Sequence, residues 1–456
     1  MKQHQKQQKI IRLGTHGEDY GSWMSNPVFY MIGGLLLSLI HIFLADTFFI
    51  SVAAGADGIT ALNLILPVYG LIFAIGSMIG IGSATRYCLC KFGGLEGTDD
   101  YFSNSIFWTL LISSIFVLIG IFFPDKILVL LGADKHILSV GLPYLRIVMC
   151  FTPFFMLNYT FTAFVRNDNS PNLAMVATLT SGIFNIIFDY IFMFPMKMGM
   201  VGAALATGVS PILSMSICTV HYLGENNSIV FTWKMPSFKK LFSSCCLGVA
   251  AFVGELSNAI TTLVFNFILL GLGGNISVAA YGVIANIALV GGALFNGVSF
   301  GLQPATSAAH GQNDRHGERE IYRQALKIGE RIAFSMVVVV LLFADQFVAV
   351  FNSENSAQLA SYASLGLRLY FLGFLVAAIN IIKSGFFSAV GKGMESSVIA
   401  LSRGVFAISL MAFALSKAFG INGVWLSFLA SEIITLALSS LISAVKKDRL
   451  DASEAR

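Results

Sequence analysis

Four acidic side chains lie inside long apolar stretches of this 456-residue chain. They are Asp46, Asp189, Glu255 and Glu432. An ionisable group inside such a stretch is costly unless it is paired or hydrated, so each is a candidate functional residue. Asn185 lies four residues before Asp189, and this spacing places the two side chains on one face of a helix.

Two further observations join these residues into one candidate site. Asp46 lies just before the first predicted outer loop, Asp189 six residues before Pro195 and Thr207 eight residues after Gly199. We therefore expect all three at a similar depth, roughly 10 Å below one membrane surface at ~1.5 Å per residue. Carboxylate, amide and hydroxyl oxygens are ligands for a hard cation such as Na⁺, and two acids can also share a proton. The sequence therefore predicts a coupling site formed by Asp46, Asn185, Asp189 and Thr207. The alternative is that each residue only caps or joins helices locally.

Glu255 lies midway along a later apolar stretch. A carboxyl at that depth suits a proton carrier or a counter-ion for cationic cargo. The alternative is a hydrogen-bonded core acid that faces Asn258 or Thr262. Glu432 has possible basic neighbours in Arg403 and Lys383, and this favours a structural ion pair.

The composition excludes a water-soluble fold. Hydrophobic residues make up 56% of the chain and charged residues only 11%, against about a quarter in ordinary soluble domains. The net charge of +4 is small and indicates no nucleic-acid surface. The six cysteines lack metal-ligand spacing, and no cofactor is expected. The first 25 residues are polar, so a removable signal peptide is not expected.

Long apolar runs predict an all-α membrane protein with twelve transmembrane helices, because barrel strands would give short alternating segments instead. The predicted helices cover residues 27–50, 58–85, 102–124, 138–164, 171–194, 199–222, 241–271, 276–303, 326–351, 358–390, 396–417 and 421–445.

The two halves of the chain resemble each other. A shift of 221 positions places Gly70, Gly76 and Gly80 on Gly291, Gly297 and Gly301, and it also places Gly199, Gly202, Leu205 and Ser210 on Gly420, Gly423, Leu426 and Ser431. Such a repeat indicates two six-helix lobes related by a pseudo-two-fold axis along the membrane normal, with substrate bound between them. The predicted boundaries are an N-terminal tail over 1–26, a first lobe over 27–222, a linker over 223–240, a second lobe over 241–445 and a C-terminal tail over 446–456.

The basic residues predict the orientation in the membrane. With the N-terminus in the cytoplasm, 20 of the 28 Lys and Arg residues fall on cytoplasmic segments and 4 on outer loops. Because Lys and Arg accumulate on the cytoplasmic side, we expect a multi-pass protein of the cell membrane with both termini in the cytoplasm.

Several segments resemble the multidrug and toxic compound extrusion (MATE) transporters. They are LADTFFISVAAGADGITALNLILPVYGLIFAIGSMIGIGSATRYC at 44–88, YLRIVMCFTPFFMLNYTFTAFVRNDNSPNLAM at 144–175, FNIIFDYIFMF and MGMVGAALAT within 184–207, GVSFGLQPATSAAHGQ at 297–312 and FGINGVWLSFLASE at 419–432. The similarity covers about 28–445.

The resemblance implies two six-helix lobes that exchange Na⁺ or H⁺ for organic cations by alternating access. The family's first-helix Asp matches Asp46, its fifth-helix Asn and Asp match Asn185 and Asp189, and its sixth-helix Thr matches Thr207. The seventh-helix Glu of other branches resembles Glu255. The helix-10 acid of some branches is absent, and Asn380 and Lys383 lie there instead.

The function predicted from the sequence is a secondary active multidrug efflux antiporter, not an enzyme. It would export amphipathic or cationic compounds in exchange for Na⁺ or H⁺ and work as a monomer among membrane lipids. One alternative is a lipid-linked saccharide flippase of the same superfamily, which should show a cavity ringed by Arg or Lys. An integral-membrane enzyme would need a metal or phosphate motif such as HExxH, and the sequence contains none.

Overall fold

The computed structural model describes residues 46–94, 98, 100–133, 135–168, 170–224, 227–351 and 356–454, and the regular structure over these ranges is helical. In chain order the helices are α3 (Asp46–Phe92), α4 (Asp100–Phe122), α5 (Pro124–Leu130), α6 (Lys135–Cys150), α7 (Thr152–Asn167), α8 (Pro171–Met193), α9 (Gly199–Leu223), α10 (Phe238–Gly311), α11 (Arg315–Phe351), α12 (Ala357–Phe371), α13 (Phe374–Ala389), α14 (Gly393–Leu401), the π-helical segment η2 (Ser402–Phe406), α15 (Ala407–Phe419) and α16 (Ile421–Glu454).

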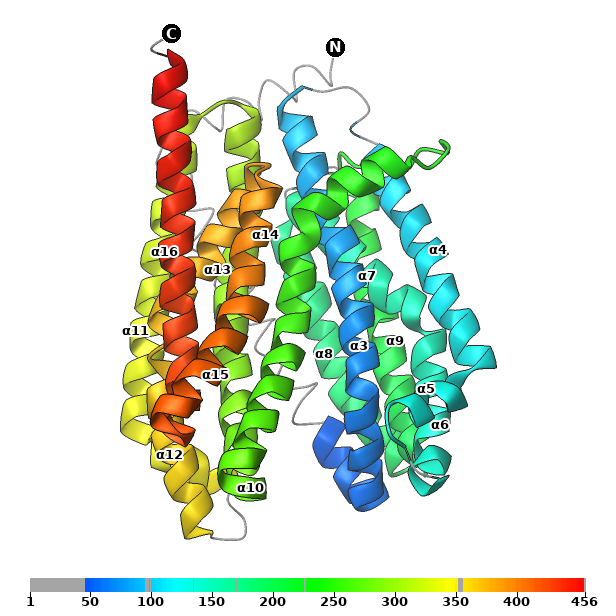
Figure 1. The fold of residues 1–456 in the computed structure, drawn as a ribbon. Helices are drawn as coiled ribbons and strands as arrows, with labels where there is room; N and C mark the ends of the chain where they lie inside the picture. Colours follow the sequence, from blue (N-terminus) through cyan, green and yellow to red (C-terminus); the bar gives the residue numbers. More distant parts are fainter. Residues whose placement is uncertain are drawn as a thin grey trace.

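The helices form two lobes that stand side by side (Figure 1). Helices α3–α9 make the N-terminal lobe and α10–α16 the C-terminal lobe, and α3 packs along α10 where the lobes meet. Each lobe has its own principal apolar core. One core gathers residues between Ile50 and Ala204, joined by Leu241 from the start of α10, and the other gathers residues between Phe265 and Phe428.

The predicted all-α membrane fold is confirmed. Among the described residues, nine helices are long and apolar enough to cross a membrane, and counting each of two bent helix pairs as one span gives eleven. Most of the predicted first span, 27–50, lies outside the described residues. The predicted domain boundaries remain predictions.

Two predicted helices are each broken into a bent pair. The span predicted over 138–164 consists of α6 and α7, which meet at an angle of 44°, and the span predicted over 358–390 consists of α12 and α13, which meet at 46°. Pro153 lies in the first turn of α7 and has no N–H group to continue the hydrogen bonding of α6, which explains the first bend. α3 is helical from Asp46 onward, and its part that is long and apolar enough to cross a membrane begins at Ala61, close to the start of the predicted span 58–85.

The internal repeat is visible in the backbone. Gly199 and Gly420, which the 221-residue shift superimposes, both have positive φ, at 53° and 58°, where side chains are rarely tolerated. Each glycine lies at the turn between two antiparallel helices, α8 and α9 in one lobe and α15 and α16 in the other. The repeat therefore marks equivalent helical hairpins.

Candidate functional site

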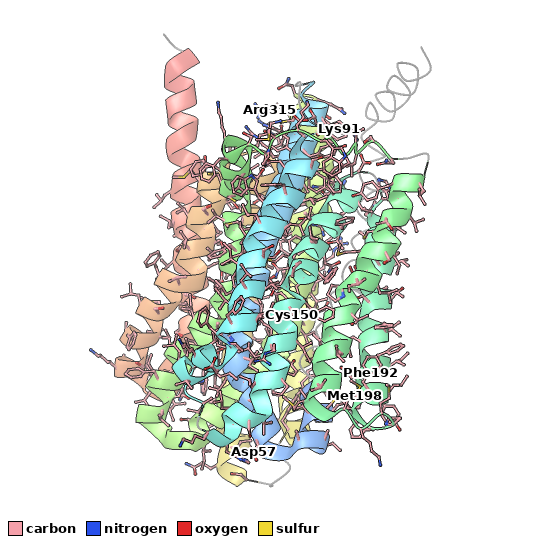
Figure 2. All side chains as sticks on the ribbon, turned by 90° about the vertical axis from the view of Figure 1, so that its right-hand side faces the viewer. Asp57, Lys91, Cys150, Phe192, Met198 and Arg315 are labelled. Carbon is pink, nitrogen blue, oxygen red and sulfur yellow. The ribbon has the colours of Figure 1, made fainter. Side chains whose placement is uncertain are left out.

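The α8–α9 hairpin carries three of the predicted coupling residues. A Cβ atom on Gly202 of α9 would lie only 2.9 Å from the backbone of Phe192 on α8, so the two helices touch at this glycine. Further along, the Ser181 hydroxyl donates to the Ser210 carbonyl over 2.7 Å. These two contacts fix how the helices lie against each other. Figure 2 shows Phe192 and Met198, at the hairpin turn, far from Lys91 and Arg315.

Asn185 and Asp189 both lie inside the N-terminal lobe, with 1% and 0% of their surfaces exposed. They are one helical turn apart on the same face of α8. The contacts on either side, Ser181 with Ser210 and Phe192 with Gly202, place Thr207 of α9 at the level of Asn185. The hairpin thus brings Asn185, Asp189 and Thr207 to neighbouring positions within one lobe.

Asn185 shows the signature of a polar site. Its Nδ2 atom is buried without a hydrogen-bond partner among the described residues. A buried amide N–H group without an acceptor is costly and calls for an explanation, such as an ordered water that accepts from it. The backbone of Asp46 begins α3, but its side chain lies outside the described residues, so its predicted place in the cluster remains a prediction.

The equivalent hairpin of the C-terminal lobe is apolar at the same positions. Gly423 of α16 touches Leu415 and Ser416 of α15, just as Gly202 touches Phe192 and Met193. Counting back from these contacts gives Ile408 and Ala412 as the counterparts of Asn185 and Asp189, and both are buried. The counterpart of Thr207 is Phe428, whose ring stacks on Tyr370 with centroids 4.3 Å apart. Helix packing does not itself require polar residues here, because the other lobe packs without them.

The chemistry available at the cluster suits a small cation of low charge. No group of three or more His, Cys, Asp or Glu side chains that could hold a metal ion occurs within the described part of the chain. One carboxylate with neutral amide and hydroxyl oxygens is instead a weak, oxygen-only donor set, appropriate to Na⁺ or a proton.

Glu255 lies where the two lobes meet, on α10 of the C-terminal lobe. Its Oε1 atom accepts a hydrogen bond from the hydroxyl of Tyr159, on α7 of the N-terminal lobe, over 3.3 Å. The sequence suggested Asn258 or Thr262 as partners, but the bonded partner is Tyr159. No local pattern predicts this contact, because the two residues are 96 positions apart in the chain.

Glu432 forms the structural pair predicted for it. Arg403, on the π-helical segment η2, donates from Nη2 to Glu432 Oε1 over 2.8 Å, and Asn380 donates to Oε2 over 2.7 Å. Lys383 takes no part and bonds Ser439 over 3.0 Å. This cluster links α13, η2 and α16 inside the C-terminal lobe.

Another buried acid, Asp168, was not predicted from the sequence because it lies at a helix end. Lys91 of α3 approaches its Oδ1 at 2.7 Å, and His221 of α9 approaches its Oδ2 at 2.9 Å. The backbone N–H of Ser228 also donates to Oδ2, over 2.8 Å, and the Ser228 hydroxyl contacts Oδ1. Asp168 therefore ties the segment after α9 to the ends of α3, α7 and α9.

Comparison with known proteins agrees with this architecture. The MatE family model matches residues 32–191 and 250–413. The multidrug export protein MepA of Staphylococcus saprophyticus is 27% identical over 433 residues, covering 93% of this chain and 94% of the relative. MepA of Staphylococcus aureus is 26% identical over 430 residues, covering 93% and 94%.

Solved structures share the fold. A crystal structure of MATE in complex with MaL6 matches with a TM-score of 0.88 at 22% identity, covering 96% of this chain and 98% of the other. A multidrug resistance MATE family transporter in an outward-facing conformation matches with a TM-score of 0.85 at 20% identity, covering 94% and 98%. The family model covers well over half of the sequence, so this chain belongs to the MatE family and is a membrane transporter rather than an enzyme.

Proposed function

We propose that this protein is a multidrug efflux antiporter, which exports amphipathic, cationic organic compounds in exchange for Na⁺ or H⁺ by alternating access. Membership of the MatE family supports a transporter, and relatives that share about a quarter of their residues over nearly the whole chain are multidrug export proteins. Membrane lipid surrounds the monomer, and both chain ends lie in the cytoplasm.

The observation that carries the proposal is a polar cluster buried at α8–α9 hairpin positions whose counterparts in the other lobe are apolar. Asn185 and Asp189 are buried on α8 with Thr207 alongside on α9, whereas the matching positions of the second lobe are Ile408, Ala412 and Phe428. The same hairpin packs with apolar residues in the second lobe, so the polar residues of the first lobe are not needed for packing and indicate a function. Together with Asp46, the cluster would bind Na⁺ or a proton.

Cation binding couples to export through the packing of the N-terminal lobe. A cation would neutralise the buried carboxylate, and this changes the free energy of each arrangement of the helices around it. A ligand shifts a conformational equilibrium only by its difference in affinity between the two states. The cation would therefore favour the state in which cargo is held weakly, and Glu255 would hold the cationic group of the cargo in the other state.

The test is transport of a fluorescent organic cation in inverted membrane vesicles, with the Na⁺ and pH gradients imposed separately. We expect Asp189→Asn and Asp46→Asn to reduce gradient-driven transport at least tenfold, because an amide cannot carry the ion's counter-charge. Asp125→Asn removes an exposed acid from α5 of the same lobe and is the matched control. Normal pumping by both site variants under both gradients would overturn the coupling assignment.

A further inference from the structure

The hydrogen bond between Tyr159 and Glu255 joins the two lobes. Tyr159 belongs to α7 and Glu255 to α10, and the hydroxyl lies 3.3 Å from Oε1. The Glu255 side chain is thus in contact with the lobe opposite to its own. A contact of this kind exists in one arrangement of the lobes and is lost when they separate at this level.

Tyr159 is fixed firmly to the N-terminal lobe. A Cβ on Gly76 of α3 would lie 3.2 Å from the Tyr159 ring, and one on Gly80 would lie 2.7 Å from its backbone, so α3 and α7 are in direct contact behind it. The ring also packs against Phe73, with centroids 6.2 Å apart. When the lobes move, the Tyr159 hydroxyl moves with the N-terminal lobe.

The two lobes are in backbone contact beside this hydrogen bond, at Gly82 and Gly248, and this contact is called here the seal. A Cβ on Gly82 of α3 would overlap the Ser244 carbonyl of α10, and one on Gly248 would overlap the Met78 carbonyl, so the two helices touch through their backbones. Gly248 is two turns before Glu255, and this seal lies toward the end of the molecule that carries Lys91 and Arg315, called here the Lys91 end (Figure 2). In the proposed orientation the Lys91 end is cytoplasmic.

Other charged groups near this part of α10 are engaged elsewhere. Gly404 of η2 packs against Ser257 and Val253, but the neighbouring Arg403 pairs with Glu432 over 2.8 Å. Lys383 of α13 bonds Ser439. Arg166, at the end of α7, lies over the Phe300 ring, 5.0 Å from its centroid. From α3, the residues at the seal are Met78 and Gly82, neither of which titrates. Within the described part of the chain, Tyr159 is the residue that donates a hydrogen bond to the Glu255 carboxyl.

We propose that the Tyr159 hydroxyl takes the place of the cationic cargo at Glu255 when the lobes close at the Lys91 end, and so helps to expel the cargo on the other side. With the lobes apart at that end, Glu255 has no Tyr159 and binds the positive group of a compound arriving from the cytoplasm. On closure, Tyr159 donates to the carboxylate and competes with the bound cation. This inference rests on the proposed role of Glu255.

The proposal is tested by comparing cargo binding with cargo turnover. The probe is a fluorescent lipophilic cation, whose binding to the purified protein is followed by fluorescence anisotropy and whose export is followed in proteoliposomes. Tyr159→Phe keeps the ring and its packing but removes the donor. Because a hydrogen bond to a charged group is lost from the competing state, we expect binding to tighten about tenfold while turnover falls.

Glu255→Gln and the double variant make the test specific. In the Glu255→Gln protein, adding Tyr159→Phe should change neither cargo affinity nor turnover. The carboxylate for which the Tyr159 hydroxyl and the cargo compete is then absent. Tyr69→Phe, which removes a hydroxyl that meets Tyr144 within the N-terminal lobe, is the matched control and should leave affinity unchanged. The pH profile of transport should shift with Tyr159→Phe only while Glu255 is present.

Each outcome bears on one claim. If Tyr159→Phe changes affinity equally in the parent protein and in the Glu255→Gln protein, or leaves it unchanged in the parent protein, the competition is overturned. If Glu255→Gln itself binds and transports normally, the proposed role of Glu255 fails, and the Tyr159 inference fails with it. If Glu255→Gln is inactive while Tyr159→Phe behaves as the parent protein, only the Tyr159 inference is lost.

Discussion

The buried carboxylate of Asp168 holds several separate segments of the chain together. Its carboxylate contacts Lys91, His221 and Ser228, which come from α3, α9 and the segment after α9. Asp168→Asn leaves the Lys91 ammonium without its counter-ion, and breaking a buried pair in this way costs about 3 kcal/mol or more. We expect a clearly lower unfolding temperature in detergent, measured by differential scanning fluorimetry, while the exposed Asp125→Asn should have little effect.

The same carboxyl gives the stability a dependence on pH. Burial alone would raise the pKa of Asp168, but the hydrogen bond from His221, the charge and hydrogen bond of Lys91 and the Ser228 hydroxyl outweigh it, so the pKa is lowered. The folded protein then binds this proton more weakly than the unfolded chain does. Its stabilisation is complete above the ordinary carboxyl pKa of about 4 and is lost as the pH falls below it. The unfolding temperatures of the parent protein and Asp168→Asn should converge as the pH is lowered, and a constant difference would contradict this account.

At the scale of helices, the contact between α3 and α10 depends on two glycines. Cβ atoms on Gly82 and Gly248 would overlap backbone carbonyls of the opposite helix, which cannot move aside as a flexible side chain would. Gly82→Ala and Gly248→Ala should therefore hold the lobes apart at the Lys91 end and reduce transport at least tenfold. Helix destabilisation is not the cause, because alanine favours a helix over glycine by about 1 kcal/mol.

Two glycines of the same helices provide the control. A Cβ on Gly70 of α3 or Gly254 of α10 would have nothing within 4 Å. Gly70→Ala and Gly254→Ala should transport normally in the same vesicle assay. Labelling of a single cysteine introduced near the seal would show the Lys91 end more accessible in the Gly82 and Gly248 variants alone. Equal transport by all four variants would show that the contact does not matter for the cycle.

The helices themselves could largely be predicted from the sequence, because length and apolar character decide them. The predictions 102–124, 171–194 and 199–222 differ from α4, α8 and α9 by two residues or fewer at each end. The bends were missed because both halves of each bent pair are apolar, so composition does not change at the break. The depth count placed Asp189 and Thr207 at one level because α8 and α9 share a common turn, and the four-residue spacing added Asn185; that these residues form a coupling site stays a prediction. The Tyr159 contact to Glu255 could not be found in this way, because the packing of two lobes decides it.

The whole molecule has its lobes in contact at the Lys91 end, and alternating access requires that this contact open. Phe92, at the end of α3, and Gly311, at the end of α10, meet there: a Cβ on Gly311 would lie 2.5 Å from the Phe92 Cβ. Cysteines at these two positions, with a small shift of the backbone, satisfy the short Cβ–Cβ separation of a disulfide, about 3.5–4.5 Å. A bond between them would hold the lobes together.

We therefore expect Phe92→Cys with Gly311→Cys to abolish transport when oxidised and to recover it on reduction. The background replaces the six native cysteines, Cys88, Cys90, Cys150, Cys218, Cys245 and Cys246, so that no other bridge forms. Each single variant should transport equally with and without oxidant, which separates the bridge from the substitutions. Mass spectrometry measures the fraction bridged. Because a permanently closed Lys91 end stops the cycle after one release, loss of transport should follow that fraction, and full transport by fully bridged protein would mean that this end does not open.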